Sequence, residues 1–212
     1  MTAADHATAP DLDAGIAKVR ILTVCTGNIC RSPYAALLLR EGLQWARPGA
    51  FEVTSAGTHA LVGRPMDEAS AALLAAKGLA DTDFRARLLT HQLIRDQALV
   101  LVMASEHKDL VIDEAPAAHR RTLTIRELAH VLEDVGTRHD WPTLLADAGA
   151  DDVVSRWAAL PGLIAVHRRR MRREDRDVVD PYKRGQQAFD RMGLEVDPAV
   201  RCIVRWERQF PR

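Results

Sequence analysis

Residues 25–33, with the sequence CTGNICRSP, constrain the fold of this chain more than any other stretch. Residues 19–24 before them are rich in β-branched residues and leucine, which predicts a buried strand. Residues 34–43 after them are rich in Ala and Leu, which predicts a helix. A glycine-containing turn between a strand and a helix directs backbone N–H groups to one point, where the helix dipole adds positive charge. The stretch therefore predicts an anion-binding loop.

Cys25 begins this loop and Arg31 ends it, with five residues between them. An arginine side chain can form two parallel hydrogen bonds with phosphate oxygens. The amides, the helix N-terminus and the guanidinium all favour a thiolate over a thiol at Cys25. The loop thus predicts a nucleophile directed at the phosphorus of a bound phosphate.

Composition limits the class of protein. The 212 residues include 29 basic and 29 acidic residues, a balance that argues against general binding of nucleic acid. The three cysteines lack zinc-site spacing and predict reduced thiols in a cytoplasmic protein. No apolar run approaches the ~20 residues that span a bilayer, so we expect no membrane partner. The sequence leaves the oligomeric state open.

Three more stretches predict strands: residues 51–56 alternate in polarity, residues 98–103 are a continuous apolar run, and residues 121–125 form a further short strand. These strands alternate with helical patterns. This alternation predicts an α/β fold, a three-layer sandwich with a central parallel four-stranded sheet and helices on both faces. Residues 136–174 interrupt the alternation and predict a helical insertion. The C-terminal helical pattern is expected to break at residues 193–197.

We expect residues 1–16 to be a disordered leader, because they are acidic and alanine-rich and lack the features of a signal peptide. Residues 17–212 then form a single domain that carries the insertion at about 136–174.

The loop resembles the active-site loop of the low-molecular-weight protein tyrosine phosphatases. The similarity extends to residues 55–58, 63–67, 99–103 and 180–182, and leaves out the leader and about 136–174. It implies a hydrolase, a phosphotyrosine protein phosphatase with a phosphate-binding loop, that needs no cofactor and no metal. Its substrate would be a phosphotyrosine protein or a small aryl phosphate.

The resemblance also implies roles for individual residues. Cys25 would attack phosphorus and form a phosphocysteine intermediate, and Asp180 would act as general acid and then base. Asp177 is a rival acid that lacks the following proline. Phosphate would be bound by Thr26, Gly27, Asn28, Ile29, Cys30 and Arg31, through backbone amides and the guanidinium.

Three polar residues are implied to support the loop. Asn28 would hold it through side-chain hydrogen bonds, and Ser32 would stabilise the thiolate or serve as an ordinary helix cap. Ser55 either joins this network or is a serine of an ordinary turn, and the sequence supports both alternatives equally.

Four further residues have expected places around the loop. Tyr182 and Ile29 would line a slot for an aromatic ring, and an apolar residue at position 29 favours phosphotyrosine over phosphoarginine. Cys30 forms a redox pair with Cys25 or is a packed small side chain. Trp45 is expected to pack in the core.

The chain departs from the family pattern at Ala36, Phe84 and Ala104, where members often carry Glu, His and Asp. The missing histidine implies one support fewer for the loop. Two other functions stay open: an arsenate reductase that uses a low-molecular-weight thiol, and a weakly active phosphate-binding module. Arsenate reductases that relay a disulfide need two further cysteines, and the chain has none between Cys30 and Cys202.

Overall fold

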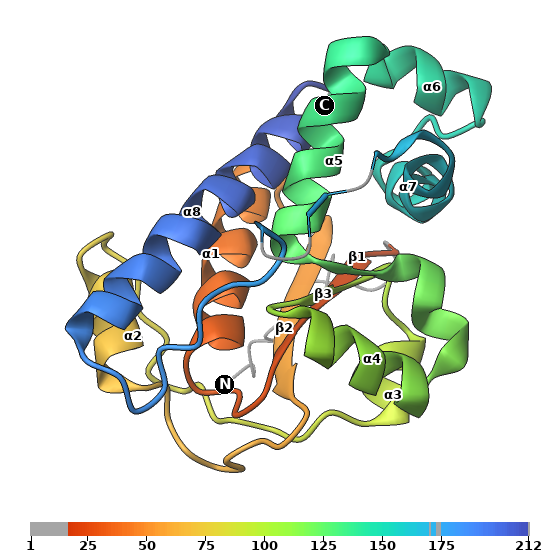
Figure 1. Cartoon of the computed structure of the whole chain (residues 1–212). Coiled ribbons are helices and arrows are strands. Elements are labelled where there is room, and N and C mark those ends of the chain that lie inside the picture. The colour runs from red at the N-terminus through yellow and green to blue at the C-terminus, as the bar shows by residue number, and fades with distance from the viewer. Residues whose placement is uncertain (1–16, 170, 173–174, 212) are drawn as a thin grey trace, which may run out of the picture.

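A parallel sheet of four strands forms the centre of the computed structural model, which describes residues 17–169, 171–172 and 175–211 (Figure 1). The predicted leader lies outside these residues. The strands follow the order β2-β1-β3-β4, and neighbouring strands are parallel, which confirms the predicted sheet. Their bounds are β1 Val19–Cys25, β2 Phe51–Gly57, β3 Leu99–Val102 and β4 Thr122–Thr124.

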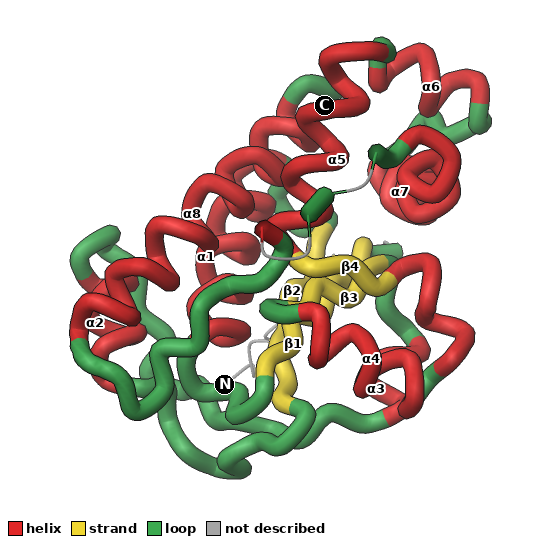
Figure 2. Tube along the Cα trace, in the orientation of Figure 1, coloured by secondary structure: helices red, strands yellow, loops and turns green. Residues whose placement is uncertain are grey.

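Helices cover both faces of the sheet, as Figure 2 shows in the same view. The helices on one face are α1 Arg31–Ala46, α5 Ile125–Arg138 and α8 Gln186–Arg208, with α2 Glu68–Ala75 beside α1 and α8. The elements on the other face are α3 His91–Arg95, α4 Ser105–Glu114 and the short 3-10 helix η1 Pro116–Arg121. Both layers agree with the predicted three-layer fold.

The alternation of side chains along the strands divides the core in two. Ile21, Leu99 and Leu101 pack with α1, α5 and α8, whereas Leu22 and Val100 pack with α3 and α4. Strand β3 is buried on both faces and is a continuous apolar run, which is why the sequence revealed it.

The prediction of a break at residues 193–197 is wrong, because α8 is continuous from Gln186 to Arg208. Gly193 lies inside it, where an added Cβ would stand 3.5 Å from the hydroxyl oxygen of Tyr34. Pro198 removes the hydrogen bond to the carbonyl of Leu194, and Leu194 is exposed, so water can serve that carbonyl instead. The buried face of α8 offsets both helix-breaking residues.

The predicted insertion consists of the end of α5 and two more helices, α6 Trp141–Asp147 and α7 Val153–His167. Helix α5 runs through Gly136 to Arg138, so the first residues of the insertion continue a helix of the sheet layer. Helix α7 ends before the basic run that follows it. Helices α6 and α7 lie beside α5 at one end of the molecule (Figure 1).

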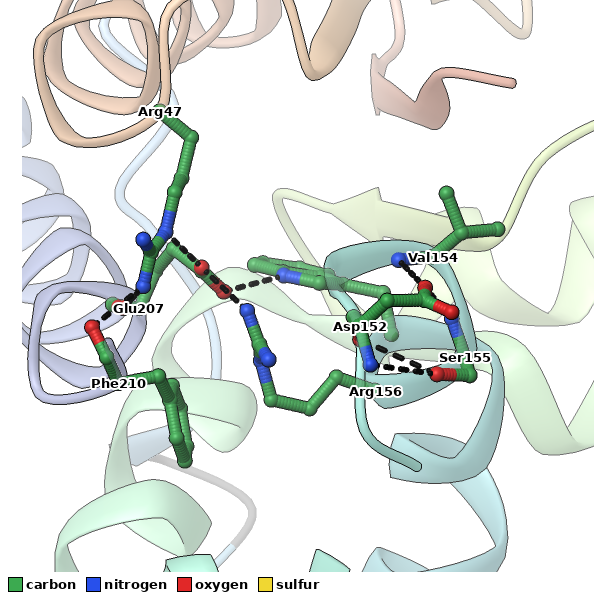
Figure 3. Close-up of polar contacts among 8 residues, drawn as sticks. Arg47, Asp152, Val154, Ser155, Arg156, Glu207 and Phe210 are labelled. Carbon is green, nitrogen blue, oxygen red and sulfur yellow. Dashed lines mark hydrogen bonds and ion pairs between the residues drawn. The ribbon is translucent and has the colours of Figure 1, made fainter. Parts of the chain in front are cut away.

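A buried carboxylate fixes α7 to the ends of α1 and α8 (Figure 3). Glu207 on α8 is 0% exposed and accepts hydrogen bonds of 2.8 Å each from Arg47 Nε, Arg156 Nη2 and Trp157 Nε1. We call these four residues the Glu207 cluster. Because its three donors come from two other segments, the residue after α1 and helix α7, the cluster joins α7 to the helices that pack on the sheet.

None of the described helices is long and apolar enough to cross a membrane.

Candidate active site

The loop lies at the carboxyl end of β1, an inner strand of the sheet, and leads into the first turn of α1. Its carbonyl groups point outward: those of Thr26, Gly27 and Ile29 accept hydrogen bonds from the backbone N–H groups of residues 59, 61 and 67. In the described part of the chain, no group accepts a hydrogen bond from the N–H groups of residues 26–30. Donors left unpaired in this way form a cradle for an anion.

Two backbone features give the loop its shape. Asn28 has a φ of 55°, in the left-handed region that asparagine tolerates better than most residues. Gly57, at the end of β2, lies so close that a Cβ there would stand 2.5 Å from the carbonyl oxygen of Thr26. Only glycine allows this approach, so the neighbouring strand braces the loop.

The side chain of Asn28 is fully hydrogen-bonded. Its Nδ2 donates to Ser32 Oγ and to Ser55 Oγ, both at 2.9 Å, and its Oδ1 accepts from the backbone N–H of Arg87 at 2.9 Å. The structure thus brings Asn28, Ser32 and Ser55 together. Arg87, which the sequence did not suggest, donates its backbone N–H to Asn28, and its Nε donates to the carbonyl of Ser55 at 2.8 Å. The loop therefore has its support although Phe84 replaces the expected histidine.

The nucleophile candidate lies within this network. The sulfur of Cys25 is 3.0 Å from the hydroxyl oxygen of Ser32. Because Asn28 donates to that same oxygen, the hydroxyl proton of Ser32 can be directed at the sulfur. A hydroxyl donor therefore lies within hydrogen-bond distance of the sulfur.

Arg31 is 3% exposed and faces the loop from the start of α1. Its Nη2 lies 2.9 Å from Asp180 Oδ2, whereas its contacts with Thr26 Oγ1 and the carbonyl of Val178 are long, at 3.4 and 3.5 Å. Its Nε is buried and has no hydrogen-bond partner among the described residues. The guanidinium therefore keeps donors for a bound anion.

The structure separates the two candidate acids. Asp180 is 44% exposed in its side chain and faces Arg31. Asp177 instead caps α4, because its Oδ1 accepts from the backbone N–H and the hydroxyl of Ser105 at 2.8 and 2.7 Å. Ala104 stands at the N-cap of α4 and offers no side chain, so Asp177 supplies that function from another segment.

A cavity of about 130 Å³ opens above the loop. Tyr182 and Ile29 both line it, as predicted, and Tyr182 is 41% exposed. The lining residues are Cys25, Thr26, Gly27, Ile29, Cys30, Arg31, His59, Leu61, Asp180 and Tyr182. The floor of the cavity carries the polar groups, and apolar side chains form part of its walls.

Cys30 is a buried residue of the loop, and burial raises the pKa of its thiol to about 12. The negative charge of Asp67 adds to this shift. Cys25 and Cys30 are both free thiols in the structure, so a disulfide between them remains a prediction. The prediction that Trp45 packs in the core is wrong: Trp45 is 60% exposed, with the guanidinium of Arg208 3.9 Å above its ring.

His107 is a site residue that the sequence analysis missed. It lies in the first turn of α4, is 1% exposed, and its Nε2 is 2.9 Å from Thr26 Oγ1. Burial, with the charge of Arg31, lowers the pKa of its ring to about 4. Its place just after β3, at the same sheet edge as the loop, was a signal that could have revealed it.

Within the described residues, no group of three or more His, Cys, Asp or Glu side chains is arranged to hold a metal ion.

Comparison with known proteins agrees with this geometry. Residues 20–141 match the low molecular weight phosphotyrosine protein phosphatase family. The low molecular weight protein-tyrosine-phosphatase Etp of Escherichia coli K12 is 43% identical over 103 residues, 49% of this chain and 66% of Etp. A protein-arginine-phosphatase of Geobacillus stearothermophilus is 41% identical over 108 residues, 51% of this chain and 70% of that protein. The match to Etp thus spans slightly less than two thirds of its length.

Solved structures are similar over most of their length. The Erwinia amylovora tyrosine phosphatase AmsI has a TM-score of 0.62 and 25% identity, with 94% of this chain and 97% of that chain covered. The tyrosine phosphatase Wzb of Escherichia coli K30, solved with sulphate, has a TM-score of 0.60 and 26% identity, with 90% and 96% covered. The family match includes the loop and ends before Asp180, so the place of Asp180 comes from the structure. The chain belongs to the low molecular weight phosphotyrosine protein phosphatase family.

Proposed function

We propose that this chain hydrolyses aryl phosphate monoesters, either phosphotyrosine in a protein or a small aryl phosphate, through a phosphocysteine intermediate. The observation that supports the proposal is that four kinds of chemical group line one cavity. A thiol, a cradle of unpaired amides, a buried arginine and a half-exposed carboxyl group all line it.

In the first step, the Cys25 thiolate attacks phosphorus and forms the S–P bond while the P–O bond to the phenol breaks. Arg31 and the loop amides bind the remaining phosphate oxygens and stabilise the charge that develops on them. The dianion replaces Asp180 as the partner of Arg31. The carboxyl group then faces a negative charge, a setting that favours its protonated form, and it gives its proton to the leaving phenol oxygen.

In the second step, a water molecule attacks the phosphocysteine. Asp180, now a carboxylate, takes a proton from this water, and the S–P bond breaks to release phosphate and restore the thiolate. The hydroxyl of Ser32 stabilises the sulfur as it leaves.

The walls of the cavity support an aromatic substrate. Tyr182 offers a half-exposed ring two residues after Asp180, and the apolar side chain of Ile29 also lines the cavity. Planar rings stack on such walls, whereas a flexible phosphoserine leaves them uncovered. We therefore propose phosphotyrosine as the preferred phosphoamino acid.

Steady-state kinetics on phosphotyrosine, phosphoserine and phosphoarginine test the substrate class. We expect the highest kcat/KM for phosphotyrosine, and a preference for phosphoarginine would overturn the proposal. Thiol consumption that depends on arsenate would instead indicate an arsenate reductase. Phosphotyrosine binding without turnover would indicate a binding module.

Asp180→Asn and Asp177→Asn form a matched pair that tests the general acid. The first is expected to lower kcat/KM on phosphotyrosine by about 10²–10⁴-fold. The second keeps an acceptor oxygen at the cap of α4 and should lower kcat/KM far less. The reverse order would show that the assignment is wrong.

We also propose that the protein works in the cytoplasm, where thiols stay reduced. All three cysteines are buried and free, which supports this location.

A further inference from the structure

We propose that Glu195 is a positioning residue that fixes the acid loop, residues 177–182, and so determines where Asp180 delivers its proton. The proposal rests on the proposed function, in which Asp180 is the general acid. Glu195 belongs to α8, outside the residues that line the cavity.

Glu195 binds the backbone immediately before Asp180. Its Oε2 accepts a hydrogen bond of 2.8 Å from the N–H of Val179. The Glu195 side chain is 10% exposed, so this bond is shielded from water. A charged acceptor in such a place forms a stronger hydrogen bond than a neutral one.

The acid loop has other attachments on both sides of Val179. The carbonyl of Pro181 accepts from the N–H of Arg184 at 2.9 Å in a local turn, and the remaining attachments lie at residues 177 and 178. The side chain of Asp177 caps α4, and its carbonyl accepts from Arg126 Nη1 at 2.8 Å. The N–H of Val178 donates to the carbonyl of Met103, at the end of β3, at 2.8 Å. Residues 177 and 178 are therefore held by the sheet layers, whereas Val179 is held by α8 through Glu195.

Asp180 itself has few restraints in the protein. Besides Arg31, its carboxylate accepts one hydrogen bond, from the N–H of Tyr182 at 3.2 Å, which closes a local turn. In the proposed reaction the phosphate takes the place of Asp180 on Arg31. The bond between Glu195 and Val179 then ties the backbone next to Asp180 to another element of the fold, whereas the bond from Arg184 to Pro181 closes only a local turn.

Arg191 pairs with the other oxygen of the Glu195 carboxylate. Its Nε lies 2.7 Å from Oε1, one turn earlier on α8, and leaves Oε2 for Val179. The Arg191 side chain is 68% exposed, so this ion pair contributes little to stability by itself. Arg191 therefore supplies a control: its removal breaks the ion pair but keeps the bond from Glu195 to Val179.

A misplaced general acid has a specific kinetic signature. The phenol of tyrosine has a pKa of about 10, so its oxygen needs a proton as it leaves. The oxygen of 4-nitrophenol is a better leaving group and needs the proton less. A loosely held Asp180 should thus harm phosphotyrosine hydrolysis more than 4-nitrophenyl phosphate hydrolysis, whereas general damage to the loop would harm both equally.

The experiment measures kcat/KM on both substrates for the full chain and for Glu195→Ala, Glu195→Gln and Arg191→Ala. We expect Glu195→Ala to lower the ratio of phosphotyrosine to 4-nitrophenyl phosphate by about five- to tenfold, a part of what general acid catalysis contributes. Glu195→Gln keeps an acceptor for Val179 and should restore most of the ratio. Arg191→Ala should change it less than about twofold.

The Asp180→Asn variant separates this proposal from the proposed function. If Asp180→Asn leaves the ratio unchanged, Asp180 is not the acid and the proposed function fails. If Asp180→Asn lowers the ratio but Glu195→Ala does not, only the role of Glu195 fails. In the Asp180→Asn background, Glu195→Ala should lower the ratio no further, and a further loss would overturn the positioning role. Circular dichroism and urea denaturation confirm that each variant is folded.

Discussion

Two sites in this molecule each pair buried arginine with a carboxylate, and they differ in how exposed that carboxylate is. In the Glu207 cluster, a carboxylate that is 0% exposed meets side-chain donors from Arg47, Arg156 and Trp157. At the loop, Arg31 is equally buried, but the carboxylate of Asp180 is 44% exposed and meets one guanidinium nitrogen.

The difference shows which buried ion pair can exchange its anion. The Nε atoms of Arg31 and Arg156 both lack a hydrogen-bond partner among the described residues, so an unpaired donor does not by itself mark a ligand site. What distinguishes the loop is a carboxylate that can leave towards solvent, next to a cavity with free amides. The enclosed Glu207 can only hold the fold together.

The largest expected effect comes from a substitution that disrupts the Glu207 cluster. Glu207→Gln leaves two buried guanidinium groups without their counter-charge, so the free energy of unfolding should fall by about 3–5 kcal/mol. Urea denaturation measures it. Glu133→Gln is the matched control, since Glu133 pairs with Arg205 on the surface, and should cost less than about 1 kcal/mol. Equal losses for both variants would contradict the comparison.

Arg31→Lys should weaken phosphate binding at the loop and leave the fold intact. A lysine cannot form two parallel bonds with the phosphate, so kcat/KM should fall by roughly 10²–10³-fold with little change in the urea midpoint. Arg47→Lys should have the opposite effect, with a lower midpoint and kcat/KM within about twofold of the parent. A large loss of activity in Arg47→Lys would show that the two sites are coupled.

His107, a buried side chain beside the loop, should make the stability of the protein depend on pH. The pKa of its ring is about 4 in the folded protein and 6.5 in a model peptide, so the unfolded chain binds the proton more tightly. Its contribution to stability is therefore present above about pH 6.5 and is lost as the pH falls towards 4, by roughly 2–3 kcal/mol. Urea denaturation across this range measures the loss. His107→Gln should flatten that part of the profile, and an unchanged slope would contradict the assignment.

The smallest effect concerns an arginine that is not buried. Arg208 lies over the exposed ring of Trp45, so Trp45→Ala should cost less than about 1 kcal/mol. Trp157 belongs to the Glu207 cluster and is 0% exposed, so Trp157→Ala should lower the free energy of unfolding by about 3–5 kcal/mol. Thermal denaturation of both variants tests this, and similar losses would mean that Trp45 is packed more tightly than its exposure indicates.

Much of the fold followed from patterns that extend over short distances. Strand β3 was readable because a strand buried on both faces is a continuous apolar run, and β2 was readable because its residues alternate in polarity. The continuity of α8 was not readable, because Gly193 and Pro198 disfavour a helix and only the packing of its buried face offsets them. The same limit hid the exposure of Trp45.

The candidate site divides in the same way. Cys25, Asn28, Arg31 and Ser32 lie within one strand–loop–helix unit, so their proximity follows from eight contiguous residues of sequence. Arg87 and His107 belong to other segments, and no local pattern connects them with the loop. They became visible only when the carboxyl ends of neighbouring parallel strands met at one edge of the sheet.

The sequence alone determined that a thiol and an arginine share an anion-binding loop, because the strand, the turn and the helix that form it are contiguous. Only the tertiary structure decided which carboxylate faces that arginine. Asp177 and Asp180 carry the same group three residues apart, and the choice depends on where the rest of the chain holds the backbone between them. The bonds from Ser105 to Asp177 and from Val179 to Glu195 join residues 72 and 16 positions apart, a relation that only packing can establish.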